Sequence, residues 1–105
     1  MSKKQITEQH NIETNYVYQL NNQDLLVAIK NEKKYTSNSW GTFPTWKRLG
    51  YDIIKGEKAT TITRYVDVEN GLDNNGEKKY KTIKRYYNLF NKDQTKLSQT
   101  IKENE

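Results

Sequence analysis

Two strand-like segments separated by a run of turn-forming residues constrain the fold of this chain more than any other feature. The segments ATTITRYVDV (residues 59–68) and KYKTIKRYYNLF (residues 79–90) are rich in the β-branched and aromatic residues that favour strands. Between them, ENGLDNNGEK (residues 69–78) is rich in glycine, asparagine and aspartate, which favour turns. The pattern predicts a long antiparallel hairpin with its tip at residues 69–78, on which the rest of the chain must pack.

The second of these segments predicts two strand faces of different chemistry. Side chains alternate across a strand, so Ile83, Tyr87 and Leu89 point to one side. The other side receives Tyr80, Lys84, Tyr86 and Phe90. We therefore expect one face to pack on a core and the other to carry aromatic rings and a cation.

The first third of the chain has helical spacing. Ile12, Tyr16 and Leu20 recur every four residues, which predicts one stripe of a helix. Asn21 and Asn22 interrupt this stripe, and either could cap a second helix.

That second helix corresponds to NQDLLVAIKNEKK. Its Leu25, Leu26 and Ile29 share a helical face, and Asp24 lies in the favourable first turn. The following KYTSNS is expected to be a polar loop.

A third, short helix is predicted around the second tryptophan. Thr42 can cap it, Pro44 is tolerated in a first turn, and Gly50 suits the position just after the end. Trp46 and Leu49 then share one face. The expected fold class is α+β, with N-terminal helices and the short Trp46 helix packed on an antiparallel hairpin or sheet.

Length and composition predict a single domain with a thin core. The chain has 105 residues, 32% of them hydrophobic and 30% charged, and eight tyrosines must supply part of the buried area. We place the domain core at residues 15–97 and expect flexible ends at residues 1–11 and 98–105. The net charge of +5 favours polyanionic partners, although the lysines could equally serve solubility.

Several classes of protein are excluded by what the sequence lacks. It contains no cysteine, no apolar run long enough for a membrane span and no secretory signal, so a cytoplasmic protein is expected. His10 is its only histidine, and we expect it to be an inert surface residue. The acidic residues Asp67, Glu69 and Asp73 lack calcium-loop spacing. We expect no enzyme activity, no metal, no cofactor and no small-molecule substrate.

The turn DIIKGEK is a candidate phosphate site. Gly56 would let a ligand approach the backbone, and Lys55 and Lys58 would meet phosphates. Glu57 is expected to brace the turn. The alternative is an ordinary glycine turn with lysines on its outside.

Tyrosines interleaved with cations point to single-stranded nucleic acid, which is held by a positive groove and aromatic faces. We expect Tyr65 and Tyr86 to stack on bases together with Trp40, which lies in a polar loop. Arg64 and Lys84 would contact phosphates. Some tyrosines must instead belong to the core, and Trp46 is expected there.

The order of several motifs resembles a known family. Asn22-Gln23 with Leu25-Leu26 is followed by SWGTFPTWKRLG, IIKGEKATTI and YYNLFNKDQT. This order is similar to the ArdC-like N-terminal domain of plasmid antirestriction proteins and mobile-element primases, over about residues 15–97. The matching positions are Thr42, Trp46, Leu49, Gly50, Lys55, Gly56, Glu57, Lys58, Phe90, Asn91, Gln94 and Thr95.

The resemblance implies an α+β fold that binds single-stranded DNA. Larger members continue into a metallopeptidase-like or primase region. Nothing follows the domain in this sequence, so we expect a stand-alone module that works with a separate replication enzyme. Lys47 and Arg48 join the candidate DNA-binding residues on charge and position alone.

Two functions remain open. The first is a non-catalytic single-stranded-DNA-binding protein of a plasmid or other mobile element, which supports replication, priming or transfer. The second is an accessory subunit that binds a mobile-element DNA polymerase or primase, or an antirestriction inhibitor, acting chiefly through protein contacts. The DNA-binding function requires the lysine turn and the exposed tyrosines to open onto a common cationic trough.

Overall fold

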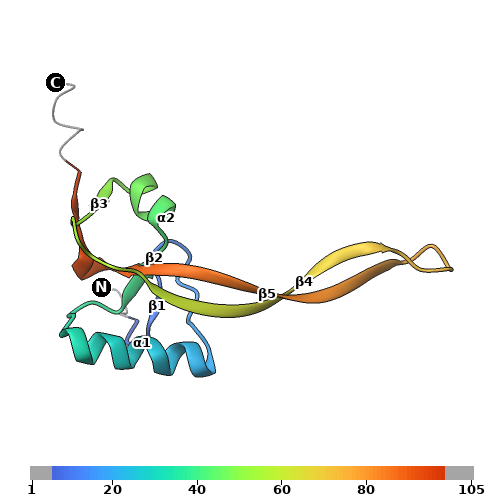
Figure 1. Cartoon of the computed structure of the whole chain (residues 1–105), viewed down its shortest axis with the longest axis horizontal. Helices are drawn as coiled ribbons and strands as arrows, with labels where there is room; N and C mark the ends of the chain where they lie inside the picture. Colours follow the sequence, from blue (N-terminus) through green and yellow to red (C-terminus); the bar gives the residue numbers. More distant parts are fainter. Residues whose placement is uncertain (1–5, 99–105) are drawn as a thin grey trace, which may run out of the picture.

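The computed structural model describes residues 6–98 and consists of a small body from which a long two-stranded arm projects (Figure 1). Its principal extents are 58 × 38 × 37 Å, and the long dimension follows the arm. Four strands form one sheet in the order β1-β2-β5-β4, and two short strands pair as β3-β6. The α+β class is confirmed.

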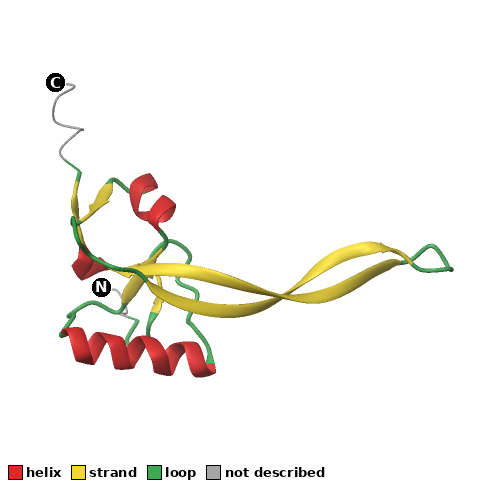
Figure 2. Cartoon of the chain, in the orientation of Figure 1, coloured by secondary structure: helices red, strands yellow, loops and turns green. Residues whose placement is uncertain are grey.

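The predicted hairpin is formed by β4 (Thr60–Leu72) and β5 (Lys78–Asn91). The distal part of this hairpin is the arm (Figure 2). The two strands pair antiparallel, with a register shift between Glu69 and Leu72. The tip is shorter than the predicted residues 69–78. Asp73 closes it, since its carboxylate accepts hydrogen bonds from the backbone N–H groups of Asn75 (2.8 Å) and Glu77 (2.9 Å).

The helix α1 (Leu20–Lys33) covers one face of this sheet at the body end. Leu26 is fully buried and packs in one cluster with Ile62 of β4 and Leu89 of β5. Ile29 packs against this cluster, whereas Leu25 is 38% exposed. The predicted helical face is therefore shifted toward Leu26 and Ile29.

No helix forms over Ile12–Leu20, so that prediction is wrong. β1 (His10–Asn11) ends just before this segment, which forms a turn and returns to pair Val17 with His10 in an isolated bridge. Leu20, expected in the buried stripe, starts α1 with a positive φ of 48° and is 84% exposed. The four-residue spacing is accidental because the backbone turns back within it.

The cap of α1 also differs from the prediction. Gln19 is the N-cap and makes no side-chain cap bond. The Asn22 amide instead donates a 2.8 Å hydrogen bond to the Thr63 carbonyl oxygen, which tethers the helix to the outer edge of β4.

The short helix α2 (Phe43–Arg48) forms as predicted and follows β2 (Ser39–Gly41). Thr42 caps it by accepting a hydrogen bond from the Thr45 N–H. Trp46 is fully buried, and its indole N–H donates to the Phe90 carbonyl oxygen at 2.9 Å. Leu49, expected beside Trp46, is 41% exposed because the helix has already ended.

The C-terminal part of the predicted core forms a second small sheet. A 3-10 turn, η1 (Lys92–Gln94), leads into β6 (Thr95–Leu97), which pairs with β3 (Tyr51–Ile53). The expected flexible ends fall partly outside the described residues, at positions 1–5 and 99–105. Within the described part, Gln9 and His10 are buried, so the ordered body extends beyond the expected start at residue 15.

Buried amide side chains supplement the small apolar core. Gln9, Asn91 and Gln94 are each at most 2% exposed. Within residues 6–98, every buried side-chain nitrogen and oxygen has a hydrogen-bond partner. A buried polar group is costly unless it is paired, so this network must form together with the core.

Candidate nucleic-acid interface

Tyr65, Lys84 and Tyr86 lie on one open face of the hairpin. Tyr65 is directly opposite Lys84, and Thr63 is opposite Tyr86, so the two tyrosines are diagonal neighbours. Their exposed fractions are 68% and 65%, as the nucleic-acid interpretation requires. The Lys84 ammonium lies 5.6 Å from the centre of the Tyr86 ring.

Arg64 points to the other face, because it neighbours Tyr65 along the strand. Its guanidinium lies over the Tyr16 ring at 4.4 Å from the centroid, a cation–π contact that holds the side chain in place. It is also paired across the strands with Arg85. The like charges repel each other there, and a bound anion would relieve that repulsion.

An open groove at the edge of β4 brings the two faces together. It has a volume of about 520 Å³. We call it the edge groove, lined by Tyr16, Gln19, Leu20, Asn21, Asn22, Thr63, Arg64, Tyr65 and Lys84. Two cations, an exposed aromatic ring and several amides thus share one concave surface without any carboxylate among its lining residues.

The beginning of α1 forms one wall of the edge groove. Its first turn contains no acidic residue, and the helix dipole makes this end favourable for anions. The exposed Leu20 carries a left-handed backbone, which costs an L-residue roughly 1–2 kcal/mol. Such strain occurs preferentially at functional sites. The sequence did not predict Leu20 as a residue of this groove, because its four-residue spacing placed it in a buried helical stripe.

The lysine turn lies apart from the tyrosines, so the predicted common trough does not form. Gly56 and Lys58 line a separate pocket of about 340 Å³ together with Lys33, Tyr35 and Gln94. Gly56 has a φ of 91° and open space where a Cβ would stand, so the backbone conformation explains this glycine without a ligand. Glu57 does brace the turn, because the Gln94 amide donates to its carboxylate at 3.1 Å. Lys55 and Lys58 are exposed.

Trp40 is the clearest error among the candidate residues. The expected exposed platform is fully buried in the core. Its indole N–H donates to the Gln9 side-chain oxygen at 2.7 Å, and its ring meets Tyr35 edge to face at 6.1 Å. The polar loop around it is covered by the N-terminal segment, which no local pattern predicted.

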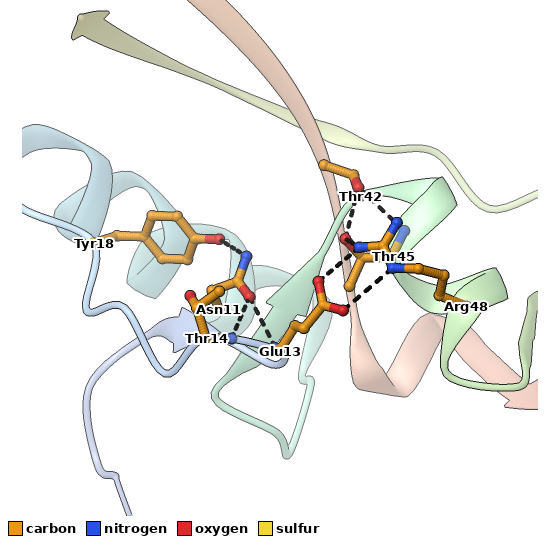
Figure 3. A network of polar contacts seen from close by, with 7 residues as sticks. All are labelled: Asn11, Glu13, Thr14, Tyr18, Thr42, Thr45 and Arg48. Atoms are coloured by element: carbon orange, nitrogen blue, oxygen red, sulfur yellow. Dashed lines mark hydrogen bonds and ion pairs between the residues drawn. The ribbon is translucent and has the colours of Figure 1, made fainter.

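Lys47 and Arg48 are engaged in ion pairs. Lys47 contacts Asp52 at 2.5 Å. Arg48 contacts Glu13 at 2.6 Å, as Figure 3 shows. The hydrogen bond from Arg48 lowers the pKa of Glu13, and the one from Lys47 lowers the pKa of Asp52. These two cations tie α2 to neighbouring segments, which makes them weaker candidates for DNA than Arg64 and Lys84.

His10 was expected to be an inert surface residue, but it is buried. Its Nδ1 lies 2.9 Å from the Glu8 carbonyl oxygen, and its Nε2 lies 3.0 Å from the Ser39 hydroxyl. Both ring nitrogens therefore have structural partners.

Within residues 6–98, no group of three or more histidine or acidic side chains is arranged to hold a metal ion. None of the helices there is long and apolar enough to cross a membrane.

Comparison with known families agrees with this architecture. The family model described as the N-terminal domain of anti-restriction factor ArdC matches residues 2–101. This chain belongs to that family. The resemblance noted from the Trp46, KGEK and closing Asn-x-x-Gln motifs is thereby confirmed. Comparison with curated protein sequences gives no significant match.

Solved structures of ArdC itself are also similar. The metal-free crystal structure of antirestriction protein ArdC from plasmid R388 superposes with a TM-score of 0.73 at 29% identity, covering 89% of this chain and 34% of that chain. The Mn(II)-bound crystal structure gives a TM-score of 0.64 at 26% identity, covering 87% and 35%. The chain thus spans about a third of the length of R388 ArdC.

Proposed function

We propose that this chain is a non-catalytic domain of a plasmid or other mobile genetic element that binds single-stranded DNA in the edge groove. One observation carries the proposal: the exposed Tyr65 shares a groove with Arg64 and Lys84, and no acidic residue lines it. Membership of the ArdC N-terminal-domain family supports it, because ArdC from R388 is a plasmid antirestriction protein.

The groove supplies the two kinds of contact that an unpaired strand needs. Arg64 and Lys84 meet phosphates, while Tyr65 and the adjacent Tyr86 stack on bases. Each base–aromatic stack contributes about 1–3 kcal/mol and tolerates any base, so sequence preference is weak. A strand supported in this way can assist replication, priming or transfer.

Salt dependence tests this proposal. Affinity for an oligonucleotide is measured by fluorescence anisotropy at about 50 and 200 mM salt, where released counterions give a slope of about −0.7 per phosphate contact. The variants Arg64→Gln and Lys84→Gln should each make the slope shallower by about 0.7. Lys96→Gln, on β6 and outside the groove, is the matched control. Salt-independent or undetectable binding by the unaltered chain refutes the proposal.

Aromatic substitutions test the stacking component. Tyr65→Ala should weaken binding by about 5- to 150-fold, which corresponds to 1–3 kcal/mol. Tyr80→Ala is the control, because Tyr80 is similarly exposed (61%) on the same face but outside the groove. Equal losses from both substitutions would place the strand elsewhere on the arm.

A second candidate is an accessory subunit that contacts a mobile-element polymerase or primase, or that inhibits a restriction enzyme. The specific observation in its favour is the projecting arm, whose exposed Leu72 and Tyr80 suit a protein interface. A pull-down with the full chain distinguishes the two functions. Retention of a polymerase or restriction enzyme after nuclease treatment, and its loss in Leu72→Ser, would favour the second.

A further inference from the structure

Phe43 lies exposed beside a second groove that the edge groove does not include. The ring is 51% exposed at the first position of α2, next to Pro44. Together with Tyr86 it lines a groove of about 470 Å³, which we call the Phe43 groove and which is also lined by Pro44, Ala59, Asn88 and Phe90.

Packing does not explain the exposure of this phenylalanine. Trp46 and Thr45 anchor α2 to the body and are 0% and 7% exposed. The helix start is already stabilised by Thr42. A half-exposed aromatic ring across a groove from a 65% exposed tyrosine therefore contributes little to folding and offers two apolar surfaces to a ligand.

Lys84 connects the Phe43 groove to the edge groove. Lys84 lines the edge groove, and its ammonium stands 5.6 Å from the centre of the Tyr86 ring, which lines the Phe43 groove. The Phe43 groove is thus next to a cation that the proposed function assigns to a phosphate.

We propose that the Phe43 groove binds an unpaired nucleobase of the same strand whose neighbouring phosphate is held by Lys84. This inference rests on the proposed function. The lining residues carry no charge, so the groove suits a flat neutral ring and leaves the phosphate to the lysine. Asn88 accepts a hydrogen bond from the Thr61 hydroxyl at 2.6 Å, while its amide N–H groups have no partner within residues 6–98 and can meet a base edge.

Oligonucleotides with and without bases test the inference. The first probe is oligothymidylate and the second is an abasic oligonucleotide of the same length. Phe43→Ala should weaken binding of oligothymidylate by about 5- to 150-fold and leave binding of the abasic probe unchanged. Phe43→Trp should retain affinity. Leu97→Ala, at another exposed apolar residue outside both grooves, is the control and should bind like the unaltered chain.

Photocrosslinking gives an independent readout. An oligonucleotide with 5-iodouracil in place of thymine should crosslink to the peptide that contains Phe43. If the unaltered chain binds oligothymidylate but Phe43→Ala binds equally well and this peptide is not crosslinked, the base site is refuted while the proposed function stands. If the unaltered chain binds no oligonucleotide, the proposed function fails first.

Discussion

The body and the arm of this molecule are built from similar residues but are held together differently. In the body, Trp40 and Trp46 are fully buried, and amides such as Gln94 satisfy backbone groups from several segments. In the arm, the two strands mainly contact each other, and Tyr80 remains 61% exposed. An isolated two-stranded hairpin is marginally stable in water. The two faces of the arm are therefore accessible to a ligand, whereas the body is stable only while its buried amide side chains keep their hydrogen bonds.

Truncating an aromatic ring in each region gives the largest contrast. Trp40→Ala should lower the free energy of unfolding by about 3–5 kcal/mol, because it leaves a cavity in the core and removes the hydrogen-bond donor of the Gln9 side-chain oxygen. Tyr80→Ala, on the arm, should change it by less than about 1 kcal/mol. Denaturant titration followed by circular dichroism measures both. Similar losses would show that the arm and body form one cooperative packing unit.

Breaking the amide network should have the next largest effect. Gln94 accepts from the Asn91 backbone N–H at 2.8 Å and donates to the Lys58 carbonyl oxygen at 2.8 Å. Gln94→Leu leaves the N–H of the fully buried Asn91 without a partner, which should cost about 1–3 kcal/mol. Gln19→Leu, at an exposed position, is the control. A neutral result for Gln94→Leu in the same titration would mean that water replaces the amide.

Shortening the arm should have a smaller effect on stability. We expect a chain in which residues 67–82 are replaced by Asn-Gly to fold with a melting temperature within a few degrees of the original, because such a turn suits the strands that remain. Calorimetry checks this expectation. If the shortened chain shows no cooperative unfolding transition, the body does not fold independently of the arm.

Acidification should have the smallest effect. The pKa of Glu13 and that of Asp52 are lowered in the folded protein, mainly by the hydrogen bonds from Arg48 and Lys47. The unfolded chain therefore binds more protons as the pH falls. The stabilisation is complete above the ordinary carboxyl range and is lost as the pH drops through the lowered pKa values.

Melting temperatures between neutral pH and about pH 3 measure this loss. The double variant Glu13→Gln and Asp52→Asn should show a flatter profile than the unaltered chain. Because both pairs are exposed, the difference should be small. Identical profiles would show that these ion pairs do not contribute to stability.

Sequence patterns correctly predicted the elements that depend on interactions between residues close together in the sequence. The β4–β5 hairpin follows from β-branched residues, alternation and turn formers, and the start of α2 follows from Thr42 and Pro44. Each depends on residues within a few positions of one another. The exposure of Tyr65 and Tyr86 followed for the same reason, since alternation separates them from the buried Ile62 and Leu89.

Contacts between distant segments decided the rest. Trp40 is buried because Gln9, thirty-one positions earlier, closes over it, and no window of sequence contains both. The lysine turn lies apart from Tyr65 because the path of the chain places it in a separate pocket, whereas Arg64 shares the edge groove with Tyr65 from the opposite strand face. Short-range preference determined which segments became strands and helices. The assembled body determined which cations and rings share a surface, because grooves exist only between elements that packing brings together.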